Sequence, residues 1–232
     1  MNWYWGDNDV EKEPPKDGFF RILYLLGNFP GKMILINVVF LLSCLPIVTI
    51  PAAHSAMSAF VGKMYRDGFD FSLDNYKREF SGRLWKQLPL GLFSAAIIFY
   101  GYYLMSLAGN FKNVGDTTTH GLLLGCGGVF FCVGLLLNVW ISVLSATLEL
   151  KNHDILKNAA ILFLIEWKRS AGILITSVIF LFLTFTFLPY SLILLLLIEA
   201  VLYWLICYEL IDPVIQERIV KPYEDLRKGE CA

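Results

Sequence analysis

The sequence predicts an all-α protein: a polytopic transmembrane helix bundle of about five spans, with amphipathic helices on the membrane surface. Two observations support this fold class. Of the 232 residues, 56% are hydrophobic and 17% are charged, and the mean hydropathy is +0.59, which is too apolar for an ordinary soluble domain. The 19 Lys and Arg residues also cluster in a few hydrophilic segments and leave long uncharged runs. The expected partner is therefore the lipid bilayer, and no nucleic-acid partner is expected.

The N-terminal part of the chain predicts a tail, a surface helix and a first span. Residues 1–18 hold five acids and two adjacent prolines, which is typical of a flexible tail. Residues 19–29 are apolar but too few to cross ~30 Å of hydrocarbon, which takes about 20 helical residues, so they predict an interfacial helix. The first span is expected over 33–53, with a kink or break at Pro46.

Two amphipathic surface helices are expected next, over 55–67 and 73–87. In the first, Met57, Phe60 and their neighbours form one apolar face, while Ser58 lies about 160° from Phe60 and is expected to tolerate a charge. The basic residues beside these faces are candidates for contact with anionic lipid or a cytosolic partner: Lys63, Arg66, Lys77, Arg78, Arg83 and Lys86. The alternative is that they only set the topology.

Four further spans are expected over 88–108, 121–150, 171–188 and 190–211, with a polar loop over 109–120. The last two come from one apolar stretch that is too long for a single crossing and is divided at Pro189. Residues 154–166 are too few to cross and predict a docked surface helix. Residues 19–211 then form a single membrane domain, and residues 212–232 form a charged cytoplasmic tail.

The distribution of Lys and Arg predicts the orientation. In a five-span protein, segments 54–87, 150–170 and 212–232 share one side and hold 6, 4 and 4 basic residues, against 5 on the other side. The positive-inside rule places the first side in the cytoplasm and the N-terminus outside.

Two intramembrane features are candidate functional sites. Small and polar residues of the third span, Gly127, Gly134, Asn138, Ser142, Ser145 and Glu149, fall within about 40° of one line. They form either a close-packed helix interface or a polar path that ends at Glu149. Glu199 is expected about 14 Å into the fifth span, as a functional acid or as a protonated carboxyl bonded to a neighbouring helix, with Asn138 the expected partner.

The sequence contains no motif that predicts catalysis. There is no GxxxxGK[ST] phosphate-binding loop and no GxSxG elbow, and the three His residues lack metal-ligand spacing. Four of the five Cys residues lie in apolar runs without a CxxC pair, as expected of small hydrophobes. No enzyme activity, cofactor, metal site or catalytic residue is therefore expected.

Three segments resemble the YesL family of bacterial integral membrane proteins, a domain of unknown function. They are NVVFLLSCLPIVTIPAAHSAMSAFVGKMYRDG, FSLDNYKREF and LKNAAILFL. Matching positions are Ser43, Leu45, Pro46, Val48 and Thr49 in the hallmark, Phe80 in the surface helix and 156–159 later, while Pro51 replaces a more usual Gly. The resemblance covers roughly residues 20–215 of the 232.

The resemblance implies a multi-pass protein of the bacterial cell (inner) membrane, linked to carbohydrate uptake. The leading hypothesis is a non-catalytic accessory or regulator of an ABC-type carbohydrate transporter, with the permease subunits as partners. The rival is an independent small transporter or channel built around Glu199 and the Asn138 stripe. A homo-oligomer stays open, because the spacing of Gly121 and Gly125 is that of a dimerisation motif.

Overall fold

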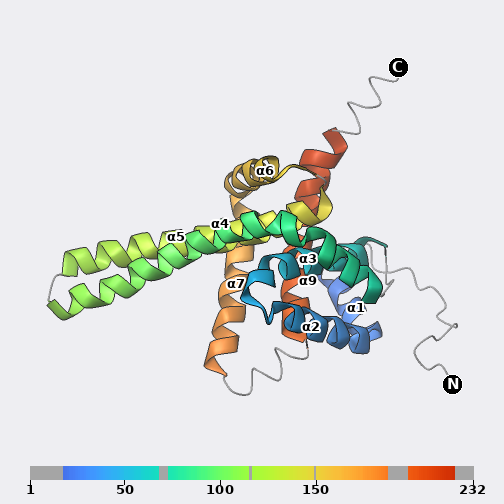
Figure 1. Cartoon of the computed structure of the whole chain (residues 1–232), viewed down its shortest axis with the longest axis horizontal. Coiled ribbons are helices and arrows are strands. Elements are labelled where there is room, and N and C mark those ends of the chain that lie inside the picture. The colour runs from blue at the N-terminus through green and yellow to red at the C-terminus, as the bar shows by residue number, and fades with distance from the viewer. Residues whose placement is uncertain (1–17, 68–72, 115–116, 149, 188–197, 223–232) are drawn as a thin grey trace.

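The computed structural model describes residues 18–67, 73–114, 117–148, 150–187 and 198–222. Every regular element in these ranges is helical, which confirms the predicted all-α class (Figure 1). The elements are α1 (Phe19–Asn28), α2 (Pro30–Cys44), the 3-10 turn η1 (Ile47–Thr49), α3 (Ile50–Asp67), α4 (Leu73–Val114), α5 (Thr117–Thr147), α6 (Asn152–Ile165), α7 (Trp167–Thr186), α9 (Ala200–Ile215) and the π-helical turn η3 (Gln216–Val220). The predicted tail 1–18 lies outside the described residues except for Gly18.

Helices α4 and α5 form a long antiparallel hairpin that projects from the other helices (Figure 1). Helix α4 has 42 residues, so it measures about 63 Å, twice the ~30 Å hydrocarbon thickness. The predicted division into a surface helix over 73–87 and a span over 88–108 is therefore wrong. Pro89 lies inside α4 without ending it, as transmembrane helices allow. Most of the predicted loop 109–120 is also helical.

Glycines bring the backbones of α4 and α5 together. A Cβ atom added to Gly101 would stand 2.5 Å from the Phe131 amide nitrogen and 2.7 Å from the Gly127 carbonyl oxygen. One added to Gly134 would stand 2.9 Å from the Ile98 amide nitrogen. Because these neighbours are backbone atoms, they cannot move aside as a flexible side chain would. The glycines of the predicted stripe on α5 thus face α4 in a close-packed helix pair.

The expected break at Pro46 is present, but the flanking helices differ from the prediction. Helix α2 ends at Cys44 and α3 begins at Ile50, and the Thr49 hydroxyl donates to the Ser43 carbonyl oxygen at 2.7 Å across the break. The predicted single span over 33–53 is therefore wrong. Helix α3 also contains the predicted surface helix 55–67, yet it lies in the core.

Helix α3 is buried almost all round. Ala52, Ala56 and Ser58 are each no more than 1% exposed, as are Met57 and Val61. Helix α4 approaches α3 closely at Gly91, where an added Cβ would stand 2.1 Å from Pro51 Cβ. The prediction that this segment presents one face to lipid and the other to water is wrong.

Three helices in the described ranges are long and apolar enough to cross a membrane: α4, α5 and α7. The pair α1 and α2, bent by 93°, would supply a fourth if both form one broken span. These helices are compatible with a multi-pass membrane protein, but with three to four crossings in the described residues and not five. Of the predicted fifth span 190–211, residues 190–197 lie outside the described residues. Helix α7 crosses α4 and α5 at a steep angle, so the apolar helices do not form one parallel bundle (Figure 1).

The remaining helices enclose the core where α5 returns from the hairpin. Helix α6 occupies the predicted docked segment 154–166 and buries Ile155 and Leu162. Trp140 of α5 is fully buried and its Nε1 donates to the Ser170 hydroxyl of α7 at 3.2 Å. Helix α9 continues past residue 212 and buries Val214 and Ile215, so the predicted tail 212–232 begins too early.

Candidate functional site

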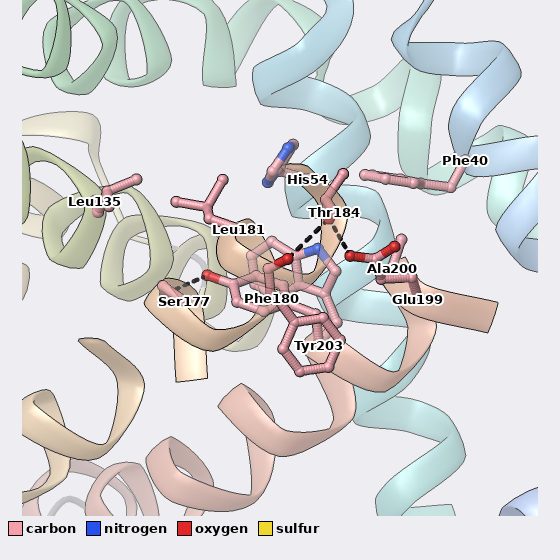
Figure 2. A pocket seen from close by; sticks show the side chains of 11 residues that line it. Phe40, His54, Leu135, Ser177, Phe180, Leu181, Thr184, Glu199, Ala200 and Tyr203 are labelled. Atoms are coloured by element: carbon pink, nitrogen blue, oxygen red, sulfur yellow. Dashed lines mark hydrogen bonds between the residues drawn. The ribbon is translucent and has the colours of Figure 1, made fainter. Parts of the chain in front are cut away.

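A pocket of about 300 Å³ lies between α7 and α9 and reaches α2, α3 and α5 (Figure 2). It extends along α7 from Ser177, ten residues into the helix, to Thr184 near its C-terminal end. Leu135 of α5 and the exposed Leu181 of α7 also line it. Its volume is at the low end for small-molecule sites, which are mostly apolar with a few polar groups.

Glu199 provides the carboxyl group of this pocket. Its side chain is 5% exposed, and Oε1 accepts a hydrogen bond from the Thr184 hydroxyl. Oε2 is buried and has no hydrogen-bond partner among the residues that the structure describes. Glu199 directly precedes α9 and bonds near the end of α7. Because residues 190–197 lie outside the described residues, its depth in the fifth span stays a prediction.

Glu199 is not paired with Asn138, and the expectation of that contact is wrong. Asn138 Nδ2 instead donates to the Ser94 hydroxyl of α4 at 3.1 Å. This bond lies in the α4 and α5 interface, whereas Glu199 contacts α7. The two residues belong to different helix contacts and do not form one polar path.

The rest of the polar stripe on α5 is buried against other helices. Ser145 lies 3.1 Å from the Ser55 hydroxyl of α3, and Ser142 is 5% exposed. Glu149 lies outside the described residues. These contacts favour the close-packed interface over the polar path, because each described polar group of the stripe meets protein.

Several pocket residues were not singled out from the sequence. The His54 ring stands between Phe40 and Trp204, with centroids 5.5 and 5.4 Å away. Burial lowers the pKa of His54 to about 4, so the imidazole is uncharged at neutral pH. The Tyr203 hydroxyl lies 3.0 Å from the Ser177 hydroxyl. No local pattern marks these residues, because four helices bring them together.

Two further polar groups in the core also escaped sequence reasoning. Asn37 of α2 is fully buried and its Oδ1 accepts a hydrogen bond from the Val201 amide in the first turn of α9, at 3.2 Å. Glu209 is an acid within α9, and its Oε2 has no hydrogen-bond partner in the described ranges. Glu209 does not line the pocket.

A second polar cluster joins the basic segments. Glu79 Oε1 accepts from Lys63 Nζ at 2.9 Å, and its Oε2 accepts from Arg83 Nε at 2.8 Å. The Arg83 guanidinium also donates to the carbonyl oxygens of Ser145 and Ala146 in the last turn of α5. A cation is favoured at that end of a helix, so Arg83 ties α4 to α5 by charge and by hydrogen bonds.

The other predicted surface residues differ from Arg83. Lys77 and Arg78 are exposed, Lys86 is partly exposed, and nothing is described of the Arg66 side chain. The Lys86 carbonyl oxygen accepts from Asn152 Nδ2 at 3.0 Å, which joins α4 to α6. Of the six basic candidates, Lys63 and Arg83 are therefore at least partly structural.

Replacing Arg83 with methionine is expected to lower the free energy of unfolding by about 1.5 to 3 kcal/mol, the range for a hydrogen bond to a charged group. The apolar stem is kept, but the Glu79 ion pair and the bonds to α5 are lost. Detergent unfolding curves of the purified protein measure the change. The control is Lys77→Met, at an exposed position, which is expected to change stability by less than about 0.5 kcal/mol. Equal losses in both variants would contradict the assigned role of Arg83.

The groups that line the pocket are suited to binding a small ligand. In the described part of the chain, no group of three His, Cys, Asp or Glu side chains has a metal-binding arrangement. In the pocket, the Ser177 hydroxyl donates to the Ile173 carbonyl oxygen at 2.8 Å and not to a general base. The arrangement can hold a small ligand through one carboxyl group and apolar walls.

The chain matches no protein-family model, no curated protein and no solved structure.

Proposed function

We propose that this chain is a non-catalytic accessory or regulatory subunit of a carbohydrate (ABC-type) uptake system in the bacterial cell membrane. The resemblance to the YesL family supplies the carbohydrate link and the bacterial membrane. The observation that carries the accessory role is the α4 and α5 hairpin, whose outer surface is apolar and unpaired over much of its length. Its exposed side chains include Leu92, Phe99, Tyr100, Tyr102, Tyr103, Leu122, Val129 and Phe130.

The hairpin suits association with other membrane helices. It projects beyond the described helices, so lipid or the spans of a permease subunit can cover both of its sides (Figure 1). Its own two helices are fixed to each other by backbone contact at Gly101 and Gly127. A rigid apolar hairpin presents a preformed surface to a partner. It therefore loses little conformational freedom on binding.

Contacts between the basic segments support a common cytoplasmic side. Arg83 reaches the end of α5, and Asn152 of α6 bonds to the carbonyl oxygen of Lys86. Arg218 Nη2 lies 3.0 Å from Glu166 Oε1, which joins the region after α9 to the start of α7. Segments 54–87, 150–170 and the start of 212–232 are thus joined by these contacts. This is compatible with the common cytoplasmic side that the positive-inside rule predicts for them.

Affinity purification from native membranes tests the accessory role. Tagged full-length protein is expected to retain permease subunits of a sugar transporter, and its deletion is expected to slow growth on that sugar. A matched variant, Phe99→Lys, places a charge on the exposed hairpin surface and is expected to reduce retention of the permease. Recovery of the protein alone, with normal growth on every transported sugar after deletion, would refute the proposal.

The pocket favours a second candidate, an independent small transporter or channel that uses Glu199. Buried acids in membrane proteins usually serve function, and Glu199 is 95% buried in a pocket, since its exposure is 5%. Asn138 is not part of this candidate, because it bonds to Ser94. Flux into liposomes that contain only the purified protein would support the transporter over the accessory subunit.

Variants of Glu199 separate a structural role from a functional one. Glu199→Leu removes the hydrogen bond with Thr184 and is expected to cost about 0.6 to 2 kcal/mol, the range for one interhelical bond in a membrane. Glu199→Gln keeps the shape and the bond, so its unfolding curve in detergent is expected to match the wild type. If Glu199→Gln loses function but keeps normal stability, the carboxyl group has a functional role. If Glu199→Gln keeps full function, the carboxyl group has no such role.

A further inference from the structure

We propose that the pocket beside Glu199 binds an organic monocation, an ammonium group that carries apolar substituents. This inference concerns the chain by itself and does not depend on the proposed transporter partner. It rests on a buried carboxyl oxygen without a partner and on aromatic walls around the same cavity.

The carboxyl group of the pocket has no cationic neighbour among the described residues that line the cavity. Glu199 Oε2 is buried without a hydrogen-bond partner in the described ranges, and no Lys or Arg is among the described residues that line the cavity. His54 also lines the cavity, but its imidazole is uncharged at neutral pH, because burial lowers the pKa of His54 to about 4. A carboxylate in such surroundings is costly unless a cation pairs with it.

The walls of the pocket suit an apolar cation. Five rings run in a continuous series of contacts, with neighbouring centroids 5.4 to 5.7 Å apart: Phe40, His54, Trp204, Tyr203 and Phe180. Aromatic faces attract cations, most strongly where water is excluded, and aromatic cages are the recurrent solution for quaternary ammonium groups. Figure 2 shows Phe180, Tyr203 and Glu199 among the side chains that line the cavity.

A bare metal ion fits this pocket less well than an organic cation. Hard cations need about six oxygen ligands, whereas the hydroxyls of Ser177 and Tyr203 are bonded to each other. The Thr184 hydroxyl is engaged with Glu199 and with the Phe180 carbonyl oxygen. The cavity of about 300 Å³ is also far larger than one ion requires and matches a small organic ligand.

Calorimetric titration of the purified full chain in detergent with benzyltrimethylammonium chloride tests the proposal. Wild-type protein is expected to show saturable binding above a protein-free detergent blank. Glu199→Gln is expected to weaken the affinity by at least about tenfold, because it removes the charge and keeps the shape. Phe180→Leu is expected to weaken it by about threefold or more through loss of one ring.

Glu209→Gln is the matched control. Glu209 lies in α9, the helix that Glu199 directly precedes. It also has a buried Oε2 without a hydrogen-bond partner in the described part of the chain, and it does not line the pocket. This variant is expected to bind within about twofold of the wild type. A thermal unfolding curve for each variant establishes that it is folded. The proposal is overturned by an absence of saturable wild-type binding, by equal affinity in Glu199→Gln, or by an equal loss in Glu209→Gln.

Discussion

Replacing Ser58 with aspartate is expected to remove about 3 to 5 kcal/mol of stability and to leave little folded protein in the membrane. Ser58 lies in α3, which packs against α4, α5 and α9, and its side chain is 0% exposed. An aspartate there would bury a charge in the core. The amount of protein in the membrane fraction and its unfolding in detergent measure the effect.

Ser58→Ala is the control for this result. The Ser58 hydroxyl has no hydrogen-bond partner among the described residues, so its removal is expected to leave stability unchanged or slightly higher. Wild-type levels of the Asp variant would show that this side of α3 faces water or headgroups, as an amphipathic surface helix would place it.

Gly101→Ala is expected to cost about 1 to 3 kcal/mol and to loosen the α4 and α5 hairpin. The added Cβ would stand 2.5 Å from the Phe131 amide nitrogen, and only a shift of one whole helix relieves that contact. The change adds a single methyl group, so the charge stays the same and the apolar surface rises only slightly. Unfolding in detergent reports the loss of stability.

Gly125→Ala is the matched control on the same hairpin. A Cβ at Gly125 meets no described atom within 4 Å, and alanine is the better helix former by about 1 kcal/mol. This variant is expected to be as stable as the wild type or slightly more so. Equal destabilisation at both glycines would argue that the two helices are not in backbone contact.

Features set by local sequence could be predicted. The all-α class, the break at Pro46 and the short helix α6 follow from long apolar runs, a proline and a segment too short to cross. The position of α3 could not be predicted, because the polar Ser58 opposite Phe60 is typical of a face turned toward water. In the structure Ser58 is fully buried, and α4 approaches α3 so closely that a Cβ on Gly91 would stand 2.1 Å from Pro51 Cβ.

The site was predicted only in part for a similar reason. Glu199 stands out as an acid in an apolar run, so the sequence identifies it. Its partner Thr184 and the neighbouring His54 come from other helices, and helical spacing carries no information about contacts between helices. The expected pair with Asn138 assumed that residues at similar depth meet, whereas α4 lies against Asn138 and α7 against Glu199.

Labelling with an impermeant maleimide tests whether the hairpin of α4 and α5 crosses the membrane with its base in the cytoplasm. Single cysteines replace Ser81 and Asn110 in a variant without native cysteines; both positions are exposed on α4, about 44 Å apart along the helix. In intact cells, the cysteine at 110 is expected to react and the cysteine at 81 to react only after permeabilisation. Equal labelling of both in intact cells, or equal protection, would contradict a crossing, and labelling of 81 alone would contradict the orientation.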